Sequence, residues 1–146
     1  MQDGDWVGET TPVMGDGPCV IVAEDDPNLR NLVSNTLTVE GYDVLGAASG
    51  REAAEILENA TRIAWSTEAI DLVIADVRMP QMTGLALLEM LRVAGWPIPF
   101  VLMTAFPDDE IRTLASVYDV PLLEKPFTLD ELRRVVRAEL VRIRPG

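Results

Sequence analysis

The chain has 146 residues, of which 48% are hydrophobic and 25% are charged, and this matches one globular domain with a core of its own. Its 24 acidic and 12 basic residues give a net charge of −12, which makes nucleic acid and anionic membrane surfaces poor partners. Histidine is absent, so a Ser-His-Asp relay, an imidazole zinc site and an imidazole general base are excluded. Eleven of the basic residues are arginines, and the remaining one is Lys125.

The first segment, residues 1–17, contains four glycines and three aspartates without apolar periodicity, so we expect a mobile tail. The single cysteine, Cys19, excludes an intramolecular disulfide and suits a reducing compartment. No stretch approaches the ~20 apolar residues of a membrane span, and the N-terminus lacks the features of a signal peptide. We therefore expect a cytoplasmic location.

Five short apolar runs follow the tail, and they alternate with amphipathic stretches. The runs cover residues 19–23, 42–47, 70–75, 98–103 and 120–123. The third and fourth are apolar nearly throughout, which is typical of strands covered on both faces, whereas the second and fifth have the pattern of flanking strands.

The amphipathic stretches carry helix start and stop signals, namely N-capping side chains, a proline at the first helical position and glycines after the last turn. These signals predict helices over residues 27–40, 50–60 and 84–94, a fourth opening at 107 and a fifth from 129 onward. The fifth begins with a capping box and has a predicted core face made by Leu132, Val136, Leu140 and Ile143.

Strict alternation of strands and helices, joined by right-handed crossovers, predicts an α/β fold with a doubly wound, five-stranded parallel sheet and helices on both faces. Such sheets bind ligands outside the carboxyl ends of their strands. The residues that end each strand are therefore the candidate site residues.

Acidic residues end the first and third runs. Glu24 and Asp25 follow the first, with Asp26 after them, and Asp76 follows the third. Asp26 has a structural role as a helix cap. The other three carboxylates would face one another across central strands, and such a cluster is costly unless a cation lies within it. Oxygen ligands without His or Cys favour Mg²⁺ or Mn²⁺ over zinc.

The fourth strand ends in Thr104, and the fifth ends in Lys125, which Pro126 follows. This chain otherwise uses arginine, so a compact ammonium at one strand end indicates a specific role. A cis bond before the proline would hold that ammonium in place. Such a site can accept a phosphoryl group, because it combines a carboxylate, a cation, a lysine and a threonine hydroxyl.

These residues resemble the receiver domain of bacterial response regulators, which accepts phosphate in two-component signalling. The resemblance covers about residues 18–142 and rests on four features that occur in family order with near-family spacing. They are Glu24-Asp25 placed five residues before Arg30, Asp76 within residues 76–84, Thr104-Ala105, and Lys125-Pro126-Phe127.

The resemblance implies a flavodoxin-like strand order 2-1-3-4-5 and a receiver domain over residues 18–144. We expect no output domain. Asp76 would be the phosphoacceptor. Asp25, Asp76 and the main-chain carbonyl of Arg78 would bind Mg²⁺, for which Mn²⁺ could substitute, and Glu24 would act through a metal-bound water.

Thr104 and Lys125 would bind the phosphoryl group and report its arrival. The donor in this family is a histidine on a sensor histidine kinase or a histidine phosphotransfer protein, which agrees with the absence of histidine here. The resemblance implies signalling through protein contacts, with a surface on the fourth helix, fifth strand and fifth helix that could form a homodimer. The net charge leads us to expect no nucleic-acid or membrane binding. The resemblance implies no enzymatic activity beyond Mg-dependent self-phosphorylation and slow autodephosphorylation.

The chain departs from the family pattern in three ways. Leu122 occupies the position of the usual aromatic switch residue. Arg78 and Phe106 occupy positions that tune phosphate lifetime in the family, and we expect both side chains to restrict attacking water. The stretch 58–70 exceeds the family norm by about two helical turns, and it either extends the second helix or forms a separate surface element.

Two other classes of protein compete with this interpretation. An aspartate-nucleophile phosphohydrolase uses a similar Asp, Thr, Lys and Mg²⁺, but it carries a second aspartate two residues after the nucleophile. That position is Arg78 here, which cannot donate a proton at neutral pH. A pseudo-receiver would keep the fold without phosphorylation, although every pocket residue is present in this chain.

Overall fold

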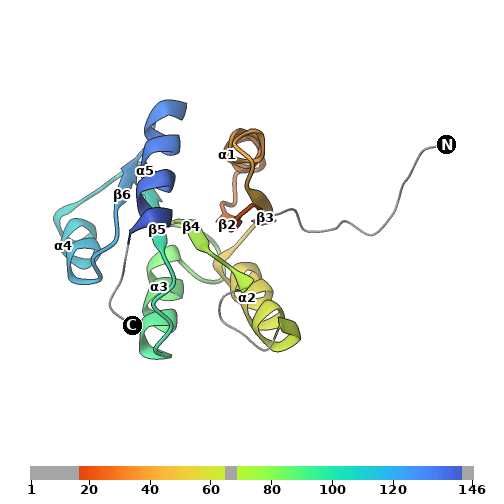
Figure 1. Ribbon diagram of the computed structural model, residues 1–146. Helices are drawn as coiled ribbons and strands as arrows, with labels where there is room; N and C mark the ends of the chain where they lie inside the picture. Colours follow the sequence, from red (N-terminus) through yellow and green to blue (C-terminus); the bar gives the residue numbers. More distant parts are fainter. Residues whose placement is uncertain (1–16, 65–68, 143–146) are drawn as a thin grey trace.

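The computed structural model describes residues 17–64 and 69–142, so the predicted tail lies, except for Gly17, outside the described residues. Strands and helices alternate strictly along the described chain (Figure 1). In chain order they are β2 (Cys19–Ala23), α1 (Pro27–Val39), β3 (Asp43–Ala47), α2 (Gly50–Ala64), β4 (Leu72–Asp76), α3 (Gly84–Val93), β5 (Phe100–Thr104), α4 (Asp109–Val117), β6 (Leu122–Glu124) and α5 (Leu129–Val141).

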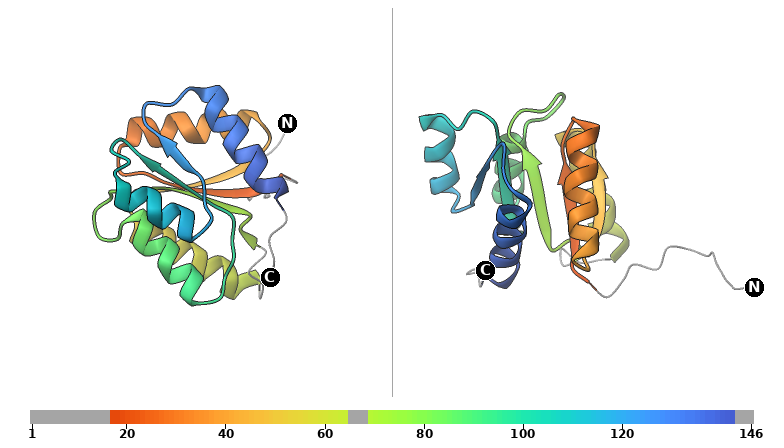
Figure 2. Two further views of the ribbon diagram at one scale, coloured as in Figure 1. Left: turned by 90° about the vertical axis from the view of Figure 1, so that its left-hand side faces the viewer. Right: turned by 90° about the horizontal axis from the view of Figure 1, so that it is seen from above.

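The five strands form one parallel sheet in the order β3-β2-β4-β5-β6. This confirms the predicted doubly wound α/β fold with strand order 2-1-3-4-5. Helices α1 and α5 cover one face of the sheet, and α2, α3 and α4 cover the other (Figure 2). The chain order reverses between β2 and β4, so the carboxyl ends of these two strands border the crevice in which such sheets bind ligands.

Two apolar cores lie on the two faces of the sheet. Ile21 and Leu102 belong to the core under α2, α3 and α4, whereas Val20 and Val101 belong to the core under α1 and α5. This division follows from the alternation of side chains along a strand. Every residue of β2, β4 and β5 is buried, while β3 and β6 each keep exposed positions, as predicted for flanking strands.

Side-chain caps start the helices where the sequence predicts them. Asp26 Oδ1 accepts the backbone N–H groups of Asn28 and Leu29 at the start of α1. Thr128 and Glu131 complete a capping box at α5, with each side chain accepting the backbone N–H of the other. These bonds satisfy donors that a helix start leaves without an intrahelical partner.

Two helix boundaries differ from the prediction. Helix α2 continues to Ala64 instead of ending near residue 60, because no glycine or proline interrupts it. The extra length therefore extends the second helix, and residues 65–68 lie outside the described part. Helix α4 begins at Asp109 rather than at 107, because Asp108 is its cap and accepts the N–H of Ile111 at 2.9 Å.

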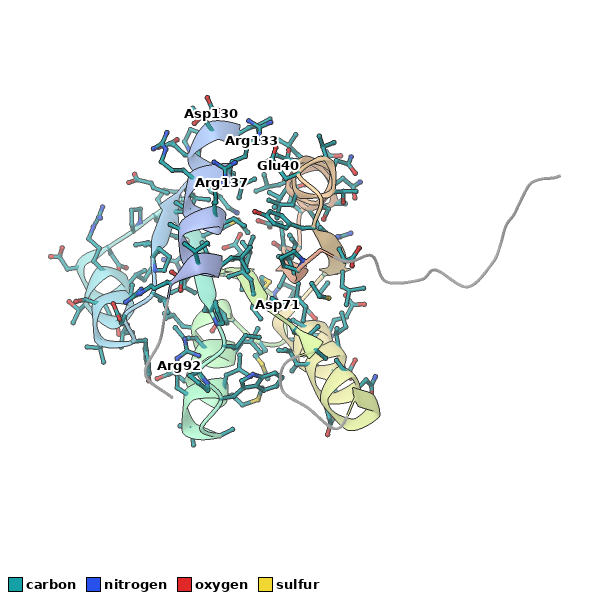
Figure 3. All side chains as sticks on the ribbon, in the orientation of Figure 1. Glu40, Asp71, Arg92, Asp130, Arg133 and Arg137 are labelled. Carbon is teal, nitrogen blue, oxygen red and sulfur yellow. The ribbon has the colours of Figure 1, made fainter. Side chains whose placement is uncertain are left out.

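Arginines of α5 join this helix to α1. Arg133 Nε and Arg137 Nη2 lie 3.5 Å and 3.1 Å from the two carboxylate oxygens of Glu40, the C-terminal cap of α1 (Figure 3). Leu132 and Val136 are buried beneath α5 and Leu140 is partly buried, while the fourth predicted core residue of this helix, Ile143, lies outside the described residues.

Candidate functional site

The carboxyl ends of four strands bring the predicted site residues together. Asp76 and Thr104 are the last residues of β4 and β5, Glu24 directly follows β2, and Lys125 directly follows β6. Parallel pairing aligns these ends, since Thr104 is in register with Glu124, the neighbour of Lys125. The third and fourth predicted strands end in Asp76 and Thr104, and the backbone ladder of the structure confirms both ends.

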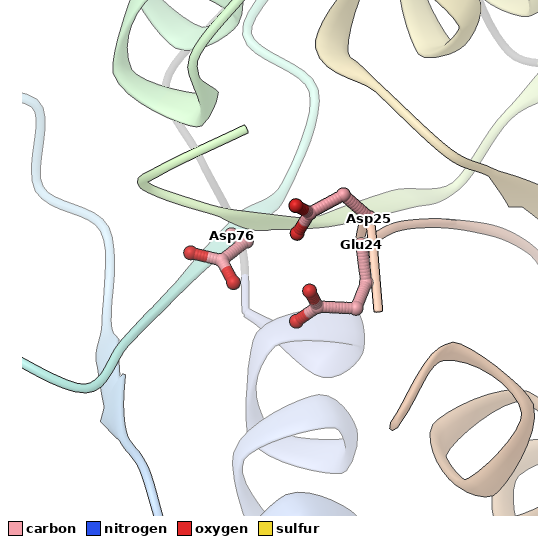
Figure 4. Close-up of side chains that lie close together, drawn as sticks. All are labelled: Glu24, Asp25 and Asp76. Carbon is pink, nitrogen blue, oxygen red and sulfur yellow. The ribbon is translucent and has the colours of Figure 1, made fainter. Parts of the chain in front are cut away.

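Three carboxylates form a cluster at this edge of the sheet. Glu24, Asp25 and Asp76 each offer an oxygen atom, and these atoms all lie within 4.8 Å of one another (Figure 4). Glu24 and Asp76 are buried, and Asp25 is exposed. The cluster therefore has a buried base and one side open to solvent. Such a set of hard oxygen donors suits Mg²⁺ or Mn²⁺.

The ammonium of Lys125 bridges two of these carboxylates. Its Nζ donates to Glu24 Oε1 at 2.7 Å and also donates to Asp76 Oδ2. The backbone N–H of Lys125 donates to the carbonyl of Thr104 at 2.8 Å, and the Lys125–Pro126 peptide is cis, as the sequence analysis suggests. Lys125 is thus held at both ends, its backbone by Thr104 and its ammonium by the two carboxylates.

Lys125 does not fully neutralise the negative charge of the carboxylate cluster. Burial raises the pKa of the Glu24 carboxyl to about 7, although the hydrogen bonds from Lys125 and from the Asp26 backbone lower it in part. Burial lowers the pKa of Lys125, but its hydrogen bonds to Asp76 and Glu24 outweigh this effect, and the pKa is raised above its usual value. One lysine faces three carboxylates, so the site favours a further cation.

Two further hydrogen bonds, at Thr104 and Arg78, connect the site to the loops that follow β5 and β4. The Thr104 side chain is buried, and its Oγ1 accepts the backbone N–H of Phe106 at 3.1 Å. The backbone N–H of Arg78 donates to Asp76 Oδ1 at 2.9 Å, while the Arg78 side chain is exposed. Each of these bonds links a site residue to the loop that follows it.

Two glycines allow close packing next to the site, a role that the sequence alone does not predict. A Cβ atom at Gly84 would lie 2.3 Å from the carbonyl oxygen of Asp76, and one at Gly50 would lie 2.1 Å from the carbonyl oxygen of Met82. Both glycines begin helices, so their position at a helix start is the signal in the sequence. The close approach itself is a tertiary contact that the sequence pattern does not encode.

The comparisons with known proteins agree with this geometry. The sequence model of the response regulator receiver domain matches residues 20–137, and the chain belongs to this family. Its fold is also that of a solved receiver domain of HemR from Leptospira biflexa, with a TM-score of 0.76 and 26% identity over 88% of this chain and 98% of that one. The chemotaxis protein CheY4 of Vibrio cholerae has a TM-score of 0.73 and 28% identity over 85% of this chain and 99% of that one.

The similar curated proteins are regulators and kinases. A probable transcriptional regulatory protein of Picosynechococcus is 36% identical over 124 residues, which cover 84% of this chain and 49% of that protein. The sensor histidine kinase RcsC of Salmonella typhi is 33% identical over 93% of this chain and 14% of that protein. The chain thus spans about half or less of the length of these relatives. None of its described helices has the length and hydrophobicity that a membrane crossing requires.

Proposed function

We propose that this receiver domain accepts a phosphoryl group on Asp76 from a phosphohistidine and passes the signal on through protein contacts. The donor would be a sensor histidine kinase or a histidine phosphotransfer protein. The observation that carries the proposal is the contact of one ammonium, that of Lys125, with two members of a carboxylate cluster at a strand-end crevice.

The donor set fits Mg²⁺, with Mn²⁺ as a chemical substitute. The carboxylates of Glu24, Asp25 and Asp76 and the main-chain carbonyl of Arg78 would hold the ion. Support comes from the chemistry of the cluster, which offers carboxylate oxygens and carries more negative charge than Lys125 neutralises. When bound, the ion would lower the repulsion between the anionic nucleophile and the anionic phosphoryl group.

In the proposed reaction, a carboxylate oxygen of Asp76 forms a bond to phosphorus while the bond between phosphorus and the donor imidazole nitrogen breaks. The electron pair of that bond leaves with the imidazole, so no oxidant or further reactant is required. The ammonium of Lys125 and the hydroxyl of Thr104 would neutralise and hydrogen-bond the phosphoryl oxygens.

The resulting signal would leave through the elements that follow these two residues. Thr104 precedes α4, and Lys125 follows β6, so a change in their bonding would shift an equilibrium at α4, β6 and α5. Leu122 is half-buried against the core on the α4 side, which is where the family carries an aromatic residue. A homodimer through α4, β6 and α5 is one arrangement in which this shift could act.

The decisive experiment incubates the protein with Mg²⁺ and acetyl phosphate and measures its intact mass. We expect one added phosphoryl group on the parent chain and none on the Asp76→Asn variant. An adduct that persists in the variant, or a parent chain that stays unmodified, contradicts the proposal, and the second result favours an unphosphorylated scaffold. Rapid turnover of many phosphomonoesters would instead indicate a phosphohydrolase.

A further inference from the structure

Arg30, on α1, contacts the loop that carries two of the three clustered acids. Its Nη1 donates to the main-chain carbonyl of Glu24, with an N···O distance of 2.7 Å. The side chain is half-buried, and its aliphatic part runs beside Gly46 of β3, where an added Cβ would lie 3.5 Å from Arg30 Cδ. Arg30 therefore touches α1, β3 and the end of β2 at once.

Other bonds fasten the same loop at the neighbouring backbone groups. The Glu24 N–H donates to the carbonyl of Ala47 at 2.9 Å, the Asp26 N–H donates to Glu24 Oε2 at 3.1 Å, and the Asp26 carbonyl accepts the Arg30 N–H at 2.9 Å. The Arg30 guanidinium completes this set at the Glu24 carbonyl. Glu24 is only 1% exposed, so loss of the guanidinium would remove a bond from an acceptor at a buried strand end.

The chemistry of this contact differs from that of Lys125. The Lys125 ammonium bonds directly to carboxylate oxygens of Glu24 and Asp76, so its removal would change the charge of the cluster itself. The Arg30 bond goes to the main chain, and it leaves the carboxylates free. A planar guanidinium on a long stem can reach such a carbonyl and keeps its charge at every accessible pH.

We propose that Arg30 is a positioning residue for the metal site, which holds the Glu24–Asp26 loop so that the carboxylates of Glu24 and Asp25 face Asp76. The inference rests on the proposed function, because it assigns a residue to the Mg²⁺ affinity of that same site. Groups that orient metal ligands typically change metal affinity by about 10-fold to 100-fold when they are removed.

The test uses the full chain without phosphodonor and measures Mg²⁺ binding by titration calorimetry. Arg30→Met keeps much of the aliphatic stem but removes the donor, Arg30→Lys restores a donor and the charge, and Arg134→Met removes one charge from an exposed position of α5. We expect Arg30→Met to weaken Mg²⁺ binding about tenfold or more, Arg30→Lys to recover most of it, and Arg134→Met to match the parent chain.

A second readout needs no metal. Hydrogen exchange of the Asp26 amide in chelator should be faster in Arg30→Met than in the parent and in Arg134→Met. The inference is overturned if the parent binds Mg²⁺ and Arg30→Met binds it equally well, or if Arg134→Met loses as much affinity. A parent chain that binds no Mg²⁺ and takes no phosphate from acetyl phosphate overturns the proposed function and the inference together.

Discussion

The Lys125 ammonium lies 2.7 Å from Glu24 Oε1, and it joins two residues that are 101 positions apart in the chain. The Glu24 side chain is 1% exposed and that of Lys125 is 19% exposed, so this ion pair is largely shielded from water. Shielding makes each partner dependent on the other, because a buried charge that loses its counter-charge is strongly destabilising.

Replacing Lys125 should therefore destabilise the metal-free fold. At pH 8 in chelator, we expect Lys125→Met to lower the free energy of unfolding by about 3 kcal/mol, because two buried carboxylates lose their cation. Urea denaturation measures this change, and Arg134→Met serves as a charge-matched control. A loss within about 0.5 kcal/mol of the control would mean that the pair behaves as a surface ion pair.

The stability of the metal-free protein should depend on pH through Glu24. Its pKa is raised from 4.5 to about 7 in the folded state, so between these values the folded chain binds more protons than the unfolded chain. The free energy of unfolding should then fall as pH rises from 4.5 to 7, by as much as about 3 kcal/mol, and stay low above pH 7.

Glu24→Gln is the control for this pH dependence, because an amide does not ionise in this range. Denaturation series at several pH values, recorded in chelator, should show a steeper decline for the parent than for the variant. Added Mg²⁺ should oppose the decline, since its binding requires ionised carboxylates. Parallel pH profiles of parent and variant would contradict the assignment to Glu24.

Gly84 should tolerate no side chain. A Cβ at this position would lie 2.3 Å from the Asp76 carbonyl oxygen, so Gly84→Ala should cost about 2 kcal/mol of stability through overpacking and slow phosphorylation by displacing Asp76. Gly46→Ala is the matched control, because its Cβ meets ordinary contacts that begin at 3.5 Å. Equal thermal stabilities for the two variants would argue against a close approach at Gly84.

Arg78 should prolong the phosphorylated state. Its side chain is exposed two residues after Asp76, where a long cation can hinder water that attacks the phosphoryl group. We expect Arg78→Ala to increase the autodephosphorylation rate roughly tenfold, which corresponds to about 1.4 kcal/mol in the barrier. The decay of the phosphoprotein signal in intact mass spectra gives this rate, and a slower decay in the variant would show that Arg78 assists hydrolysis.

Much of the fold and the grouping of the candidate site could be predicted from the sequence, for a physical reason. Central parallel strands are apolar on both faces, so the first polar residue after each run marks the edge at which ligands bind. Asp76 and Thr104 are identified in this way. The backbone ladder includes both residues, because pairing with neighbouring strands does not depend on side-chain polarity.

The contacts that support the site could not be predicted from the same signals. The bond from Arg30 to the Glu24 carbonyl and the approach of Gly84 to Asp76 depend on how helices settle against strand ends. Local periodicity and capping preferences carry no information on such distances. The extension of α2 to Ala64 is one of the two alternatives that the sequence leaves open for the stretch 58–70, since no stop signal lies near residue 60.

The two cores on opposite faces of the sheet allow the two layers of helices to change separately. Val101 and Leu102 are adjacent in β5, yet one packs with α1 and α5 and the other with α2, α3 and α4. Side chains at such neighbouring positions belong to different cores, so a substitution at one of them alters the packing beneath one layer of helices rather than beneath both. One layer of helices can therefore diversify its surface for new partners while the other layer retains its packing.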